Sequence, residues 1–114
     1  MSSTPSVSVV IPLYNAEHTI LRTLESVSKQ TSLPKEVVVV DDGSTDGSFA
    51  LVNNYILHYQ GPIHIKVLQQ PNSGVSRARN VGMKHSTGDY VALLDADDWW
   101  QPEKLARQLA ILQE

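Results

Sequence analysis

The sequence of 114 residues has no cysteine, no long apolar run and no excess of basic residues. Without cysteine, disulfides and thiolate metal sites are excluded, and the redox compartment stays open. The longest apolar runs, such as 37–40, are far too short to cross a bilayer. The opening residues MSSTP carry neither the basic flank nor the apolar stretch of a secretion signal. We therefore expect a soluble, cytoplasmic chain, with membrane association left open for a longer form.

The charge balance is mildly acidic, with nine Lys and Arg against twelve Asp and Glu and a formal net charge of −3. Because nucleic-acid-binding domains carry a basic patch or stripe, we expect no nucleic-acid partner. Apolar residues make up 41% of the chain, and a chain of this size buries roughly two thirds of its extended surface on folding. Since one βαβ unit needs about 30 residues, a single domain with about four strand–helix repeats fits this length.

Short β-branched segments are expected to form four strands, at residues 6–13, 36–41, 63–69 and 90–94. The unbroken valines at 37–40 indicate a strand buried on both faces, as parallel sheets require. Residues 90–94 are also apolar on both faces and are expected to be buried on both, whereas 63–69 alternates and belongs nearer an edge. The outer edge of the 90–94 strand is expected to stay free, which makes a homo-oligomer through this sheet edge one candidate assembly.

Between these strands, apolar residues recur at helical spacing. Asn15 and Asp46 are expected to cap the first two helices, and Pro102 to take the first position of the last. Trp99 and Trp100 are interpreted as packing anchors for the last helix, Trp100 being spaced for a hydrophobic staple with Leu105. The apolar stripes are Ile20, Leu21, Leu24 and Val27; Val52, Tyr55, Ile56 and Tyr59; Val75, Ala78 and Val81 or Gly82; and Leu105, Leu109 and Leu112. This alternation predicts an α/β fold, a parallel sheet covered by helices on both faces.

Polar residues cluster where the predicted strands end. The first strand runs into Pro12, Tyr14 and Asn15, the second into residues 41–46, and the fourth into residues 95–98. Residues 72–74 follow the third strand, with Arg77 and Arg79 just beyond them. Ligands of parallel sheets bind at the carboxyl ends of the strands, near the point where strand order reverses. The four clusters therefore predict a single ligand-binding rim.

Acidic residues dominate this predicted rim. Two carboxylates about 4 Å apart repel by roughly 4 kcal/mol at an effective dielectric near 20, so five aspartates at one edge need a cation or hydrogen-bond donors. Residues two apart in an extended segment point to the same side, so Asp95 and Asp97 can face one bound object while Asp98 turns away. Hard oxygen ligands select magnesium, manganese or calcium, and substrate phosphates often complete the coordination shell. A nucleotide diphosphate held through a divalent metal meets these requirements.

Four blocks of sequence carry a resemblance to a known family: SVVIPLYNAE, VVVVDDGSTDGS, NSGVSRARNVG and GDYVALLDADD. In order and spacing they resemble the N-terminal half of family-2 glycosyltransferases with the GT-A fold, over about residues 7–112. The resemblance implies a Rossmann-like, GT-A-type sheet in three α/β/α layers, truncated. Residues 1–114 are then expected to be a single N-terminal portion of that domain, without its acceptor-binding half.

The resemblance implies roles for residues at each strand end. Pro12 and Tyr14 match the residues that line the nucleoside pocket, with Glu17 in the family's Tyr-Asn-x-Glu pattern. Asp42 is similar to the acid that accepts a hydrogen bond from the base, commonly uracil, and Asp41 supports it.

Asp95-Ala96-Asp97 resembles the family's DxD motif. There the first acid meets the ribose or the metal, and the second coordinates the metal that bridges both phosphates. We expect Asp95 and Asp97 to be the catalytic candidates and Asp97 the metal ligand. Arg77 or Arg79 matches a basic position near the nucleotide, and we assign Arg79 to the site.

The implied activity is inverting transfer of a sugar from a nucleotide-diphosphate donor, a UDP-sugar being the first expectation, in polysaccharide biosynthesis. The acceptor is a hydroxyl of a saccharide, a lipid-linked sugar or another compound. Manganese or magnesium is expected as a Lewis acid that stabilises charge on the leaving diphosphate. The family's general base lies in the second half of the domain, so no residue here is assigned to it, and this fragment can bind nucleotide without catalysing transfer.

Two other classes stay open. A phospho-acceptor receiver domain has a similar length and an acid pair that holds magnesium, but that pair ends its first strand, and Asp41-Asp42 ends the second. A nucleotide-sugar-binding module with no enzymatic role is also compatible with a fragment. Ordinary turn chemistry explains Asp42-Gly43 as well as function does. His18, His58, His64 and His85 show no metal-ligand spacing.

Overall fold

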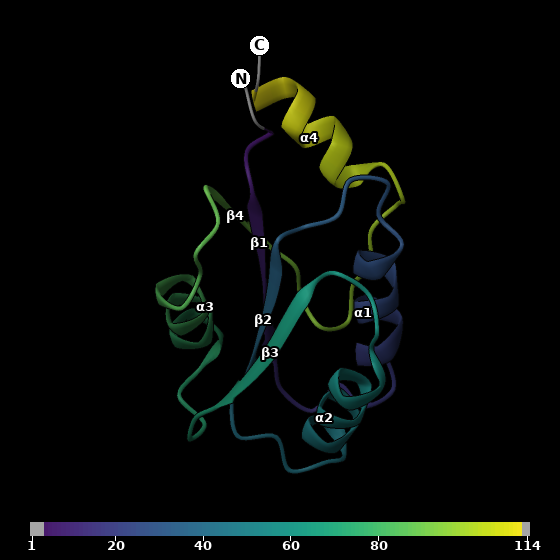
Figure 1. The fold of residues 1–114 in the computed structure, drawn as a ribbon. Helices are drawn as coiled ribbons and strands as arrows, with labels where there is room; N and C mark the ends of the chain where they lie inside the picture. Colours follow the sequence, from purple (N-terminus) through teal and green to yellow (C-terminus); the bar gives the residue numbers. More distant parts are fainter. Residues whose placement is uncertain (1–3, 113–114) are drawn as a thin grey trace.

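The computed structural model describes residues 4–112 as alternating strands and helices. These are β1 (Val7–Leu13), α1 (Ile20–Ser28), β2 (Glu36–Asp41), α2 (Ser48–His58), β3 (His64–Gln69), α3 (Val75–Lys84), β4 (Tyr90–Leu93) and α4 (Lys104–Leu112). The sheet order is β3-β2-β1-β4, and all neighbouring strands are parallel. Helix α3 covers one face of the sheet, and α1 and α2 cover the other (Figure 1). The predicted three-layer α/β fold is confirmed, and each strand lies within a residue of its predicted bounds.

The core explains the unbroken valine run. Strands β1 and β2 are buried over their whole length, because helices cover both faces of the sheet. Val37 and Val39 pack in the cluster that includes α1 and α4, whereas Val38 and Val40 pack with Ala78 of α3. The sheet thus holds the ends of β1 and β2 in fixed register, with Leu13 beside Asp41.

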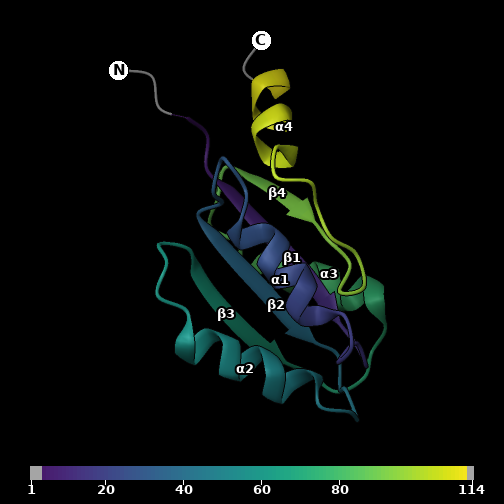
Figure 2. The same cartoon turned by 90° about the vertical axis from the view of Figure 1, so that its right-hand side faces the viewer.

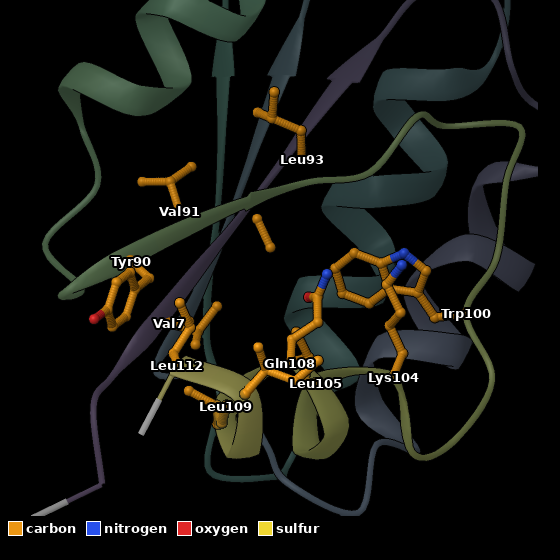
Figure 3. Close-up of a pocket in the computed structure, with 12 residues that line it drawn as sticks. Val7, Tyr90, Val91, Leu93, Trp100, Lys104, Leu105, Gln108, Leu109 and Leu112 are labelled. Atoms are coloured by element: carbon orange, nitrogen blue, oxygen red, sulfur yellow. The ribbon is translucent and has the colours of Figure 1, made fainter. Parts of the chain in front are cut away.

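Strand β4 departs from its prediction. Tyr90, Val91 and Leu93 are 41%, 39% and 46% exposed, so the prediction that this apolar strand is covered on both faces is wrong. The reason is that β4 is an edge strand, and the described chain supplies nothing beyond it except α4, which lies next to it (Figure 2). A groove of about 620 Å³ separates β4 from α4, with Leu105 and Leu112 on its helical wall (Figure 3). The free edge is as predicted, and association of two copies through it stays a prediction.

Helix starts show the other differences. Helix α1 begins after Thr19, so Asn15 is not its cap, and α4 begins at Lys104, so Pro102 lies in the preceding turn. The N-cap of α2 is Gly47, although Asp46 Oδ1 still accepts the Ser48 N–H at 2.9 Å. Trp100 packs against the core as predicted, but Trp99 is 48% exposed. No helix within residues 4–112 has the length and apolarity needed to span a membrane.

Candidate functional site

Two adjoining hollows open at the carboxyl ends of the strands. The larger, of about 520 Å³, lies between the ends of β1 and β4, where the strand order reverses. The smaller, of about 210 Å³, lies between the ends of β1 and β2 and the start of α3. Pro12, Tyr14 and Val75 line both. The two hollows are therefore halves of one site with a common wall.

The structure brings most of the predicted site residues to these hollows. Arg79, Asp95, Ala96 and Asp97 line the larger hollow, and Asp42 lines the smaller one. Arg77 lies instead on a separate surface of α3 with Lys84, because two residues along a helix turn a side chain to another face. Of the two arginines, Arg79 is the one at the site.

The Asp95–Asp97 segment is held from two sides. On the α3 side, Arg79 Nη2 lies 3.0 Å from Asp95 Oδ1, with both side chains partly exposed. On the α1 side, the hydroxyls of Thr19 and Thr23 donate to the Ala96 carbonyl at 2.9 and 2.8 Å. The segment therefore has a fixed backbone, from which Asp95 and Asp97 reach the larger hollow.

Asp97 and the next residue, Asp98, differ in orientation. Asp98 Oδ1 accepts the Trp99 N–H at 2.9 Å, and Asp98 is absent from the lining of the larger hollow, in agreement with the expectation that it turns away from a bound object. Asp97 lines that hollow, and no residue in the range 4–112 donates a hydrogen bond to its carboxylate. Asp97 thus presents an exposed, hard oxygen ligand of the kind that magnesium and manganese accept.

The loops after β1 and β2 are joined by side-chain hydrogen bonds. Asn15, at a left-handed φ of 47°, accepts the Thr45 N–H with its Oδ1 at 2.8 Å and donates its own N–H to Ser44 Oγ at 3.0 Å. Glu17 Oε2 accepts the Gly47 N–H at 2.8 Å, at the start of α2. Glu17 is not among the residues that line the two hollows, so its carboxylate supports the rim from outside. Its predicted contact with the nucleotide stays a prediction.

The acid pair at the end of β2 is buried, Asp41 being 2% and Asp42 4% exposed. Asp41 Oδ1 accepts the Ser44 N–H at 3.2 Å, which closes the turn after the strand. Burial alone would raise the pKa of Asp42, but hydrogen bonds from Gln70 and from the Ser73 and Gly74 amides outweigh it and hold the pKa below its ordinary value. Asp42 is therefore an ionised, well-bonded carboxylate in the wall of the smaller hollow.

Sequence reasoning missed three residues that build this site: Thr19, Thr23 and Gln70. Thr23 gave a signal in the sequence, because it is a polar residue inside the apolar stripe of α1. The structure buries it fully. Asn72 was expected at the rim, as part of the polar cluster after β3, and its Nδ2 donates to the Asp42 carbonyl at 3.1 Å. Gln70 gave no signal, since a glutamine at a strand end is ordinary on its own.

Comparison with known proteins gives a match over nearly the whole chain. The model of the family described as Glycosyl transferase family 2 matches residues 8–114. An uncharacterized glycosyltransferase of Escherichia coli, YibD, is 44% identical over 98 residues, which cover 86% of this chain and 28% of YibD. The putative teichuronic acid biosynthesis glycosyltransferase TuaG of Bacillus subtilis is 41% identical over 110 residues, covering 96% of this chain and 43% of TuaG. The chain thus spans less than half the length of these relatives.

Solved structures share the fold. Staphylococcus aureus TarS 1–349 in complex with UDP-GlcNAc superimposes with a TM-score of 0.83 at 38% identity, covering 95% of this chain and 31% of that one. The mannosyltransferase PcManGT of Pyrobaculum calidifontis, in complex with GDP-Man and Mn²⁺, gives a TM-score of 0.90 at 30% identity, over 99% of this chain and 34% of that one. The arrangement of strands and helices described above is therefore the one that these two proteins share.

Proposed function

Because this chain belongs to glycosyltransferase family 2, we propose that it is the donor-binding portion of a glycosyltransferase that acts on a nucleotide-diphosphate sugar. The observation that carries the proposal is the pair of adjoining hollows, one walled by Asp42 and the other by Asp95 and Asp97. Similar proteins support it, since TarS is in complex with UDP-GlcNAc and PcManGT with GDP-Man. Family membership leaves no support for the receiver domain weighed from the sequence, whose acid pair would follow β1 rather than β2.

We assign the nucleoside to the smaller hollow and the diphosphate to the larger. The smaller hollow is narrow and has Pro12, Tyr14 and Ala78 among its lining residues, which suits the flat, weakly polar faces of a base. The larger hollow carries Arg79 together with Asp95 and Asp97. Since two acids and one arginine repel a free diphosphate more than they attract it, a cation is needed between them.

The residues of the larger hollow fit a divalent metal. Asp97 offers a carboxylate without a protein partner in the described chain, and Asp95 has one oxygen on Arg79 and the other available. Groups of three or more His, Cys, Asp or Glu arranged for a metal are absent from residues 4–112, so diphosphate oxygens and water would complete the shell. When bound, manganese or magnesium supplies Lewis-acid stabilisation of the leaving diphosphate. PcManGT is in complex with Mn²⁺, which supports manganese as the first choice.

In this proposal, the chain itself binds and orients the donor. Thr19 and Thr23 fix the backbone that carries the two acids, and Arg79 fixes the orientation of Asp95. Such preorganisation places the sugar carbon for attack without reorganisation of the site during the reaction. Inversion at that carbon, a hydroxyl acceptor and a general base outside residues 1–114 complete the proposed reaction in polysaccharide biosynthesis.

The test is calorimetry with uridine diphosphate, with and without Mn²⁺, on the wild-type chain and on Asp97→Ala. We expect binding that depends on Mn²⁺ and that weakens at least about tenfold in Asp97→Ala, since loss of even an outer-shell partner of a metal costs roughly 10- to 100-fold. Asp98→Ala is the matched control, because its side chain turns to the Trp99 amide, and it should bind as the wild type does.

An affinity for uridine diphosphate that is the same with and without Mn²⁺, and the same in Asp97→Ala as in the wild type, would overturn the metal-bridged site. A binding module without enzymatic role is a separate alternative. It is decided by turnover: hydrolysis or transfer of a UDP-sugar by a longer protein that contains this chain supports the transferase, and binding without turnover supports the module.

A further inference from the structure

The segment that carries Asp95 and Asp97 leaves the sheet directly after β4. The Leu94 N–H still donates to the Val10 carbonyl at 3.0 Å, but residues 94–103 belong to no strand or helix. The segment runs beside α1 on its way to α4 (Figure 2). Because it lies outside the hydrogen-bond ladder of the sheet, another element has to fix the backbone that carries the two acids.

That element is α1, which turns a polar stripe toward the segment. The residues of the stripe are three or four positions apart and therefore share one helical face: Thr19, Thr23, Ser26 and Gln30. Ser26 Oγ accepts the Trp100 N–H at 3.1 Å. Gln30 Nε2 donates to the Gln101 carbonyl at 2.7 Å, and its Oε1 accepts the Leu105 N–H at 3.0 Å. With the bonds of its two threonines, the stripe holds the backbone from residue 96 to the start of α4.

Thr23 bonds on both sides of Asp97. Its buried hydroxyl lies 2.8 Å from the Ala96 carbonyl oxygen and 2.6 Å from that of Asp98, whereas the Thr19 carbonyl is farther away, at 3.2 Å. The one hydroxyl proton can serve either near carbonyl, and Thr19 also donates to Ala96, at 2.9 Å. The carbonyls of both neighbours of Asp97 thus have a donor. Since no residue in the range 4–112 donates to the Asp97 carboxylate, its position depends on the backbone that Thr23 holds.

We propose that Thr23 is a positioning residue for Asp97 and thereby sets the affinity of the site for a divalent cation with its diphosphate. Thr23 lines neither hollow, so it acts through the backbone and not through contact with a ligand. Thr19 lines the larger hollow and can act in both ways, so the role can be isolated at Thr23. The part of this inference that concerns the metal rests on the proposed function.

The hydroxyl of Thr23 can be removed or kept by small substitutions. Thr23→Val removes it and keeps a β-branched side chain of similar size, whereas Thr23→Ser retains it. In calorimetry with uridine diphosphate, the Mn²⁺ concentration for half-maximal nucleotide binding should rise about tenfold in Thr23→Val, since loss of a group that orients a metal ligand costs roughly 10- to 100-fold in affinity. It should stay near the wild-type value in Thr23→Ser. A merely structural defect would instead lower the fraction of chain that binds, at an unchanged Mn²⁺ midpoint.

Ser26→Ala is the matched control, because it removes another hydroxyl of the same stripe. The partner of Ser26 is the Trp100 N–H, beyond the acids, so the Mn²⁺ midpoint should not change. Thr23→Cys provides a second test if Thr23→Val does not fold. Its thiol is a weaker donor of similar size, so its midpoint should rise severalfold above that of Thr23→Ser.

Amide hydrogen exchange tests the positioning role without a nucleotide. The Asp98 N–H donates to the Asp95 carbonyl at 3.0 Å and closes the turn around Asp97. In the free protein, exchange of this amide should be about tenfold faster in Thr23→Val and faster in Thr23→Cys, as expected when a buried hydrogen bond beside it is lost or weakened. It should be unchanged in Thr23→Ser. The Leu94 amide, which bonds to β1, should exchange at its wild-type rate in every variant.

Each result decides something different. An unchanged Mn²⁺ midpoint in Thr23→Val and Thr23→Cys overturns the role in metal binding, and an equal shift in Ser26→Ala overturns its assignment to Thr23. Unchanged exchange at Asp98 in the same two Thr23 variants overturns the positioning itself. If the wild-type chain binds no uridine diphosphate at any Mn²⁺ concentration, the proposed function fails, while the exchange rates still show whether Thr23 holds the turn.

Discussion

Gly43, which follows the acid pair Asp41-Asp42, has a backbone conformation and a close neighbour that leave no room for a side chain. Its φ is +75°, and a Cβ there would meet the backbone nitrogen of Asn72 at 2.8 Å. A left-handed conformation costs a residue with a side chain roughly 1–2 kcal/mol, and a backbone atom cannot move aside as a side chain can. Gly43→Ala should therefore lower the free energy of unfolding by about 2 kcal/mol, measured by urea titration. An unchanged urea midpoint would show that the loop around Asn72 moves aside at little cost in free energy.

The residue scale is also where sequence reasoning reached its limit. It predicted that Asp42, Asp95 and Asp97 would lie on one rim, because strand ends of a parallel sheet share an edge. The sequence did not predict the hydrogen-bond partners of the polar residues on this rim. Asn15 bonds across to Thr45 rather than capping α1, and such partners depend on the register of two strands, which no local pattern records.

At the scale of elements, α3 packs on β1 through the bare backbone of Gly82. A Cβ at Gly82 would clash with Val10 Cγ1, and Val10 is fully buried in β1. Alanine would gain about 1 kcal/mol in helix propensity, but overpacking a core costs typically 1–3 kcal/mol. Gly82→Ala should therefore be destabilising by about 1 kcal/mol in urea unfolding, because β-branched Val10 has little rotamer freedom to yield.

The matched comparison for Gly82→Ala is the same substitution in a Val10→Ala background. With the valine methyl groups removed, the alanine should be neutral or stabilising, and the double-mutant cycle should give a coupling between the two positions. Equal effects of Gly82→Ala in both backgrounds would mean that α3 does not approach β1 closely at this point.

Elements were predicted more accurately than residues for a physical reason. Strand and helix periods are local properties of the sequence, so the valine run of β2 and the stripe of α1 located both elements within the sheet. The exposure of β4 was not predictable in this way. Apolar side chains show that burial of a strand would be favourable, but they do not show whether another element packs against it. Helix starts were also missed at α1 and α4, because α1 begins at Ile20 and α4 at Lys104, beyond the predicted Asn15 and Pro102.

Across the whole molecule, three carboxylates tie the stability of the fold to pH. Glu36 lies at the amino end of the sheet and accepts hydrogen bonds from Ser8 Oγ and Thr87 N–H, both at 2.6 Å. Asp42 and Asp46 lie at the opposite end. For each, burial would raise the pKa, but hydrogen bonds outweigh it and leave the pKa below its ordinary value.

A pKa that is lower in the folded state than in the unfolded state fixes the sign of the pH dependence. Above the unfolded pKa values, about 3.9 for Asp and 4.3 for Glu, all three carboxylates are ionised in both states and their bonds contribute fully. As the pH falls below about 4, the unfolded chain takes up protons that the folded chain resists, so stability is lost progressively through the lower folded pKa values. We therefore expect the urea midpoint to be level between about pH 5 and 7 and to fall steadily toward pH 3. In Glu36→Gln, which cannot titrate at the amino end of the sheet, the midpoint should be lower at pH 7 and should fall less on acidification. An equal acid dependence in this variant and the wild type would place the titration at the site end of the sheet alone.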